Sequence, residues 1–159
     1  MAAEFLKNDV QTVNPNQPVV LTTSIGCNKG YVYHRPESGI ITLRGVVNCP
    51  NACFATYQAT VNCNIAIPST GTVGPISIAL AIDGEGIPTS TAIAMPAAVA
   101  AEPPTDANFY NVTSTAIIRV PKGCCYNLSV ENTSAGATPT DPAPSILVKN
   151  ANLVVDRIA

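Results

Sequence analysis

Apolar and polar residues alternate one by one along the middle of the chain, and this pattern restricts the fold more than any other feature of the sequence. Every even position between Thr56 and Asn64 is polar. The apolar residues at the odd positions are Tyr57, Ala59, Val61, Cys63, Ile65 and Ile67. A period of two is typical of a β-strand with one buried face, so we predict one long amphipathic strand here.

Fourteen prolines and ten glycines divide the rest of the 159 residues into short segments without helical spacing. Residues 76–82 form a second apolar strand, and Asp83-Gly84-Glu85-Gly86 has the composition of a hairpin turn, so residues 89–95 are expected to return beside it. Residues 96–106 contain Pro103-Pro104 and read as a loop.

Alternation resumes at residues 110–120, and Pro121-Lys122-Gly123 then predicts a turn. We expect residues 126–130 to return beside residues 110–120 as a second hairpin. The remaining predicted strands cover residues 18–23, 31–34, 40–47 and 145–158.

Eight to ten strands at even spacing predict an all-β fold, a two-sheet antiparallel jelly-roll sandwich. The length suits one domain. We expect the jelly roll to occupy residues 17–159 and residues 1–16 to form an N-terminal arm that could attach the protein to a partner.

Charged residues make up only 11% of the chain, and the formal net charge is −2. No basic stripe is present, so nucleic acid is excluded as a partner on electrostatic grounds. Hydrophobic residues reach 47%, and the low charge leaves little repulsion between copies, which favours self-association. The N-terminal residues lack an apolar signal segment and no window is long enough to span a membrane, so we expect synthesis in the cytoplasm and no membrane partner.

Residues for catalysis are sparse. His34 is the single histidine, no serine has the spacing of a nucleophile elbow, and the expected role of His34 is that of a hydrogen-bonded strand residue. Asp83-Gly84-Glu85 could offer turn oxygens to calcium, but the ligand ladder of an EF-hand is absent. We therefore expect no enzyme activity and assign no catalytic, cofactor-binding or metal-binding residues.

The six cysteines leave three states open: free, disulfide-bonded or metal-bound. They are Cys27, Cys49, Cys53, Cys63, Cys124 and Cys125. Cys49 and Cys53 have a knuckle-like spacing that Cys27 and His34 could complete as a Cys₃His zinc set. Cys63 is in phase with the buried face of its strand and reads as a buried free thiol. The adjacent Cys124 and Cys125 cannot readily bond each other, but either could meet Cys27, Cys49 or Cys53.

The order of several segments resembles a known family. These segments are Asn14-Pro15-Asn16-Gln17-Pro18-Val19-Val20-Leu21, Gly39-Ile40-Ile41-Thr42-Leu43, Ile78-Ala79-Leu80-Ala81-Ile82-Asp83-Gly84, Leu128-Ser129-Val130-Glu131-Asn132-Thr133-Ser134 and Asn150-Ala151-Asn152-Leu153-Val154-Val155. The chain is similar to the tumour-necrosis-factor and complement-globular-head jelly roll in its bacterial and bacteriophage form, which includes phage head-fibre and decoration proteins and exosporium glycoprotein C-terminal domains. The resemblance implies a tight homotrimer.

Two functions follow as expectations. The first is a non-enzymatic bacteriophage virion protein, a trimeric head-fibre or capsid-decoration module held to the capsid by the N-terminal arm. No Gly-x-y tract precedes the domain, which favours a virion over a spore coat. The alternative is an adhesin or fibre tip that binds a host glycan or receptor through loops at residues 48–53, 96–108 and 135–145.

Overall fold

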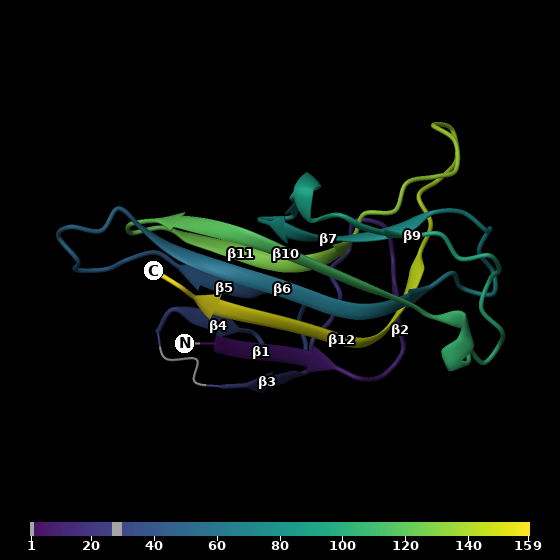
Figure 1. Ribbon diagram of the computed structural model, residues 1–159, viewed down its shortest axis with the longest axis horizontal. Coiled ribbons are helices and arrows are strands. Elements are labelled where there is room, and N and C mark those ends of the chain that lie inside the picture. Colours follow the sequence, from purple (N-terminus) through teal and green to yellow (C-terminus); the bar gives the residue numbers. More distant parts are fainter. Residues whose placement is uncertain (1, 27–29) are drawn as a thin grey trace.

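The protein is a sandwich of two antiparallel β-sheets, seen in a computed structural model that describes residues 2–26 and 30–159 (Figure 1). Its strands are β1 (Ala2–Lys7), β2 (Gln11–Val13), β3 (Thr23–Ile25), β4 (Val32–His34), β5 (Ile41–Arg44), β6 (Phe54–Ala66), β7 (Ile76–Ile82), β8 (Glu85–Gly86), β9 (Ala92–Ala94), β10 (Tyr110–Pro121), β11 (Cys125–Asn132) and β12 (Ile146–Arg157). Two single 3₁₀ turns, η1 (Pro88–Ser90) and η2 (Asp106–Asn108), are the helical elements of the described chain.

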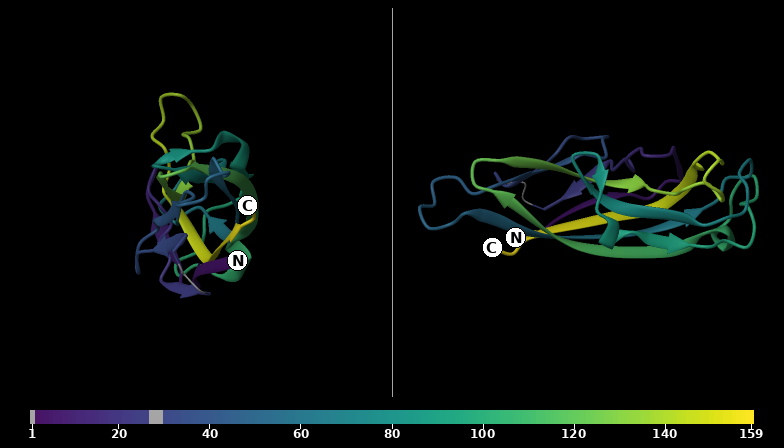
Figure 2. Two further views of the ribbon diagram at one scale, coloured as in Figure 1. Left: turned by 90° about the vertical axis from the view of Figure 1, so that its left-hand side faces the viewer. Right: turned by 90° about the horizontal axis from the view of Figure 1, so that it is seen from above.

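Each sheet contains six of these strands. Sheet A has the order β10-β6-β12-β1-β3, and β2 also pairs with β12. Sheet B has the order β4-β5-β11-β7-β8, and β9 also pairs with β7. Strands of two or three residues account for the excess over the eight to ten expected. The predicted fold, a two-sheet jelly-roll sandwich, is confirmed, and the sandwich is elongated along its strands (Figure 2).

The hydrophobic core lies between the two sheets. The alternation predicted around Tyr57 is observed along β6, whose odd-numbered residues from Ala55 to Ile65 are all buried. Phe5 of β1 in sheet A and Leu128 of β11 in sheet B are both fully buried in this core. Each such side chain contributes about 1.5–3 kcal/mol on burial, so the long strands carry most of the stabilisation.

The first predicted hairpin is present in a modified form. Asp83 and Gly84 both have positive φ, 52° and 83°, which is the conformation of a tight hairpin turn. After the turn, β8 pairs with the end of β7, η1 interrupts the return, and β9 pairs with the beginning of β7. The interruption begins at Pro88, which has no N–H to donate to the ladder.

The second predicted hairpin is wrong. β10 pairs with β6 in sheet A along its whole length, whereas β11 pairs with β5 and β7 in sheet B. The turn at residues 121–124 exists, with Gly123 at φ 76°, but it carries the chain from one sheet to the other. Turn residues specify a reversal of the chain, and they do not specify which strand the returning segment joins.

The strand predicted at residues 18–23 is also largely wrong. This segment makes isolated bridges at Pro18 and Leu21, and a regular strand begins at Thr23. Between the bridges, the side chain of Gln11 bonds both backbone groups of Val20: Nε2 donates to its carbonyl oxygen at 3.0 Å, and Oε1 accepts from its N–H at 2.9 Å. A side chain therefore satisfies this backbone in place of a ladder.

The segment expected to form an N-terminal arm is part of the sandwich. β1 lies between β12 and β3 in sheet A, and β2 pairs with the beginning of β12. Phe5 and Val13 from this segment are buried in the core. Residues 2–13 thus belong to the jelly roll, so the predicted boundary at residue 17 is not a boundary of the fold. Attachment through this segment stays a prediction.

Candidate functional site

His34 at the end of β4 has a structural environment. Its Nδ1 lies 2.7 Å from the hydroxyl of Ser24, and its Nε2 lies 3.0 Å from the carbonyl oxygen of Ser38. The carbonyl requires Nε2 to carry a proton, so the neutral ring accepts from Ser24 at Nδ1. The ring also packs on Phe5 with centroids 5.0 Å apart. Both nitrogens have partners, which confirms the hydrogen-bonded strand residue expected from the sequence.

The carboxylate of Asp83 stabilises the β7–β8 turn. Its Oδ1 accepts a hydrogen bond of 2.9 Å from the N–H of Asn127, and its own N–H donates to the carbonyl oxygen of Asn127 at 2.8 Å. Within the described residues no three His, Cys, Asp or Glu side chains gather in a way that could hold a metal ion. The turn is therefore fastened to β11 by Asp83.

The described cysteines fall into two classes. Cys63 is buried on β6, and burial raises the pKa of its thiol to about 12. Cys49, Cys53, Cys124 and Cys125 are exposed. Cys27, the other member of the hypothetical zinc set, lies outside the described residues, and the ring of His34 is already engaged by Ser24 and Ser38.

The outer face of sheet A carries a polar ladder formed by β6 and β10, with the residues Thr60, Asn62, Asn64, Asn111, Thr113 and Thr115. The amide of Asn111 donates to the side-chain oxygens of Asn62 and Asn64 at 2.8 and 3.1 Å. Thr113 donates to Asn62 at 2.9 Å. The ladder is uncharged, and these bonds between its side chains lower the desolvation cost of covering it with another protein surface.

The edge of the sandwich formed by β9 and β10 exposes large apolar side chains. Ile93 is 69% exposed, Met95 that follows β9 is 65% exposed, and Ile117 of β10 is 55% exposed. β9 and β10 belong to different sheets but contact each other at this edge. Ile117 alternates in phase with Thr113 and Thr115, so it lies on the outer face of sheet A beside the polar ladder. We call Ile93 and Met95 the apolar edge. Exposed apolar side chains gathered on one side of a protein commonly mark an interaction surface.

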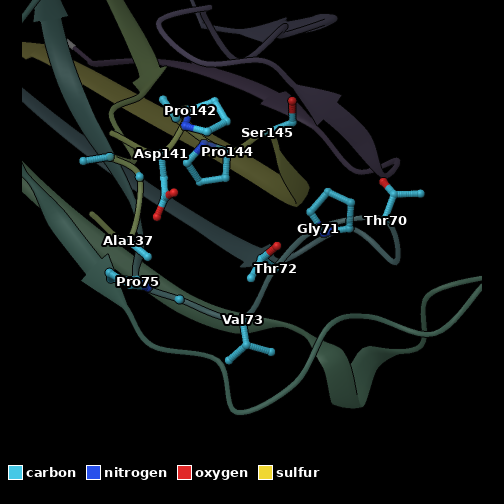
Figure 3. Close-up of a pocket in the computed structure, with 15 residues that line it drawn as sticks. Thr70, Gly71, Thr72, Val73, Pro75, Ala137, Asp141, Pro142, Pro144 and Ser145 are labelled. Atoms are coloured by element: carbon cyan, nitrogen blue, oxygen red, sulfur yellow. The ribbon is translucent and has the colours of Figure 1, made fainter. Parts of the chain in front are cut away.

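A cavity of about 410 Å³ lies at the end of the sandwich where β6 finishes and β12 begins. It lies between residues 68–75, which join β6 to β7, and residues 135–145, which join β11 to β12 (Figure 3). Its polar groups include Thr70, Thr72, Asp141 and Ser145. This volume is in the range of small-molecule sites.

The structure places two of the three loops expected to carry contacts at one end of the sandwich and the third at the other. Residues 96–108 lie at the cavity end, where the N–H of Ala100 donates to the carbonyl oxygen of Ile67 at 2.8 Å. Residues 135–145 line the cavity, together with residues 68–75, which were not singled out from the sequence. Pro68, Gly71, Gly74 and Pro75 were the available signal for that second loop. Residues 48–53 lie at the opposite end of the sandwich, beside the turn at residues 121–124 (Figure 1).

No protein-family model matches the chain, and no curated protein matches it either. Several solved structures, however, are similar to the chain. The globular domain of the zebrafish complement 1qA protein is similar with a TM-score of 0.60 and 15% identity, over 99% of this chain and 96% of that one. Eiger TNF from S. frugiperda is similar with a TM-score of 0.59 and 15% identity, over 100% of this chain and 92% of that one. The fold is the TNF-like jelly roll.

The match of the TNF-like jelly roll covers both sheets, including β1 and β2, so the whole described chain is accounted for by this fold. At 15% identity the likeness concerns architecture alone. Among the described residues no helix has the length and apolar character of a membrane span.

Proposed function

We propose that this protein is a self-associating, non-enzymatic structural module, a trimeric head-fibre or capsid-decoration protein of a bacteriophage virion. The observation that carries the proposal is that one jelly roll presents two different uncharged surfaces, the apolar edge and the polar ladder. The trimeric state and the location in a virion are what the sequence resemblance to phage head-fibre and decoration proteins implies.

Two unlike surfaces on one chain favour a head-to-tail contact. In such a contact the apolar edge of one copy packs on the outer face of sheet A of the next copy, and the rotation between copies closes a ring. Ile93 and Met95 provide the apolar area, and the polar ladder, with Ile117 beside it, provides an uncharged receiving surface. Three copies close the ring in this proposal.

Attachment to a capsid needs a different surface from the one expected. Since β1 and β2 are paired within sheet A, the N-terminal segment holds the domain together. The N- and C-termini lie toward the same end of the sandwich as the β5–β6 loop (Figure 1). We propose that this end, outside the apolar edge, contacts the capsid.

Immunoelectron microscopy of phage particles released from a host that carries the gene tests the virion role. Antibody against the purified chain is expected to label particle heads at regular positions. Label on the host cell surface with none on particles would contradict the virion role and leave the trimer intact. Labelling of tails alone would contradict the head-fibre and decoration assignment.

A second function, recognition of a host glycan or receptor, is favoured by the cavity between residues 68–75 and 135–145. Its hydroxyls and the Asp141 carboxylate suit a neutral, hydroxyl-rich ligand. Binding on a glycan array that is lost in Asp141→Ala and kept in Asp9→Ala, an exposed aspartate outside the cavity, would support this function. Absence of binding to any host surface fraction would contradict it.

A further inference from the structure

Four exposed cysteines lie at one end of the sandwich. Cys49 and Cys53 are in the β5–β6 loop, and Cys124 and Cys125 lie at the turn between β10 and β11 (Figures 1 and 2). Free cysteine is among the most buried residue types in proteins. Exposure of these four in one small region therefore calls for a chemical explanation, which the virion role and the proposed interface do not provide.

Backbone contacts bring the two segments together around Lys122. The N–H of Lys122 donates to the carbonyl oxygen of Cys53 at 2.9 Å, and its ammonium donates to the carbonyl oxygen of Cys49 at 2.9 Å. The N–H of Cys124 closes the turn by donating to the carbonyl oxygen of Pro121 at 3.0 Å. A turn closed in this way holds its first and last Cα atoms within about 7 Å.

Cys53 and Cys124 each lie one residue outside a strand, and the alternation of β6 and β11, continued by one residue, directs both toward the inner faces of the sheets. Cys53 precedes β6 and is in phase with Ala55, which is buried on the inner face of sheet A. Cys124 precedes β11 and is in phase with Leu128, which is buried on the inner face of sheet B. The N–H of Gly45 donates to the carbonyl oxygen of Cys124 at 2.9 Å, so the sheet B ladder reaches this residue.

Cys125 has the opposite phase. It is paired with the exposed Arg44 and lies on the outer face of sheet B, so the register directs it away from Cys53. Cys49 lies on the far side of the turn at Pro50 and Asn51. The strand alternation thus favours Cys124 over Cys125, and the backbone bond of Lys122 to Cys53 favours Cys53 over Cys49.

We propose that Cys53 and Cys124 form an intramolecular disulfide when the protein meets an oxidising disulfide, and that this bond ties sheet A to sheet B at this end of the sandwich. A disulfide needs Cα atoms about 4.4–6.8 Å apart. Pairing of the backbone at Lys122 with Cys53, followed by the tight turn to Cys124, makes the two residues neighbours at this end of the sandwich.

The reaction is a thiol–disulfide exchange. With glutathione disulfide as oxidant, one protein thiolate attacks its S–S bond, and one glutathione thiol leaves. The second protein thiolate then attacks the mixed disulfide, the Cys53–Cys124 S–S bond forms, and the second glutathione thiol leaves. The two protein thiols lose two protons and two electrons, and the oxidant takes up both.

The test uses the reduced full-length chain treated with glutathione disulfide and then analysed by mass spectrometry without reduction. Intact mass is expected to fall by about 2 Da. Trypsin releases residues 45–119, which contain Cys49, Cys53 and Cys63, and residues 123–149, which contain Cys124 and Cys125. The proposal predicts that these two peptides remain joined.

Serine variants assign the bond. The joined peptides are expected in Cys49→Ser and Cys125→Ser and to be absent in Cys53→Ser and Cys124→Ser. All four positions are exposed, so each variant is expected to fold. Oxidation of the wild-type chain is expected to raise Tm by on the order of 10 °C, because the bond closes a long loop in the unfolded chain.

Several outcomes would overturn the proposal. An unchanged intact mass would show that no bond forms. A bond confined to residues 45–119, a bond to Cys27, a covalent dimer, or a joined pair that survives in Cys53→Ser would each assign the chemistry to other thiols. None of these outcomes depends on whether the protein is a virion component.

Discussion

A Cβ atom placed on Gly45 would lie 1.9 Å from the carbonyl oxygen of Pro121. Gly45 follows β5 of sheet B, and Pro121 ends β10 of sheet A. The two sheets therefore meet backbone to backbone at this end of the sandwich, where the N–H of Gly45 also bonds the carbonyl oxygen of Cys124. This close approach shows why the chain crosses between sheets at the turn after β10.

Gly45→Ala is expected to destabilise the protein by at least about 2 kcal/mol, because a backbone carbonyl must move to admit the methyl group. Urea unfolding measures this change. Gly74→Ala is the matched control, since nothing lies within 4 Å of a Cβ at that position. A cost at Gly45 no larger than that at Gly74 would show that the two sheets do not approach so closely.

Asn132 at the end of β11 joins three segments through a fully buried amide. Its Nδ2 donates to the carbonyl oxygens of Val13 and Pro144, and its Oδ1 accepts from the N–H of Ser134. Asn132→Ala is expected to cost about 3 kcal/mol because it leaves buried groups unpaired. The exposed Asn8→Ala should change the free energy of unfolding by less than about 0.5 kcal/mol. Equal effects would contradict the bonding of Asn132.

Asn132→Asp should be more harmful at neutral pH than at acidic pH. The new carboxylate would present a negative oxygen to the carbonyl oxygens of Val13 and Pro144, whereas the protonated acid can donate to one of them. We expect the deficit relative to wild type, from thermal unfolding in parallel buffers, to shrink as the pH falls from 7 to 4. A deficit that grows toward acid would contradict this account.

Cys63 makes stability depend on alkaline pH. Burial raises the pKa of its thiol from 9.0 to about 12, so the folded chain keeps a proton that the unfolded chain releases. Its contribution is complete below pH 9 and is lost as the pH rises toward 12. Between pH 7.5 and 10.5 the wild-type chain should lose about 2 kcal/mol more than Cys63→Ala. Parallel losses in urea unfolding would count against the buried thiol.

The apolar edge should control assembly. Ile93→Asp places a charge in the proposed contact, and it is expected to reduce the assembled fraction at least tenfold, because a buried unpaired charge is costly. Val47→Asp is the control, since Val47 is 66% exposed in the β5–β6 loop, away from the apolar edge. Sedimentation velocity of both variants measures the effect. Loss of assembly in both variants, or in neither, would reject the edge as the contact.

The sequence predicted the elements whose pattern is local. The alternation around Tyr57 identified β6, and Asp83-Gly84 identified a turn, because side-chain period and turn chemistry are set by neighbouring residues. The predicted partner strand of β11 was wrong because the sheet that a strand joins depends on packing between distant segments. The strand predicted at residues 18–23 was wrong because the side chain of Gln11 bonds the backbone of Val20 in place of a neighbouring strand.

The candidate surfaces were harder to predict than the fold. The apolar edge is not visible as a motif, because the exposure of Ile93 and Met95 depends on the pairing of β9 at the edge of sheet B. The sequence left open which of Cys49, Cys53, Cys124 and Cys125 meet, because the two pairs lie far apart in the chain. Topology brings them together. His34 was predicted correctly as a satisfied strand residue, although its partners Ser24 and Ser38 were not foreseen.

The mass of the protein in solution tests the central claim most directly. Multi-angle light scattering at micromolar concentration is expected to give three times the chain mass of 16.4 kDa, with no monomer peak. A monomer at that concentration would contradict the account of this chain as a self-associating structural module.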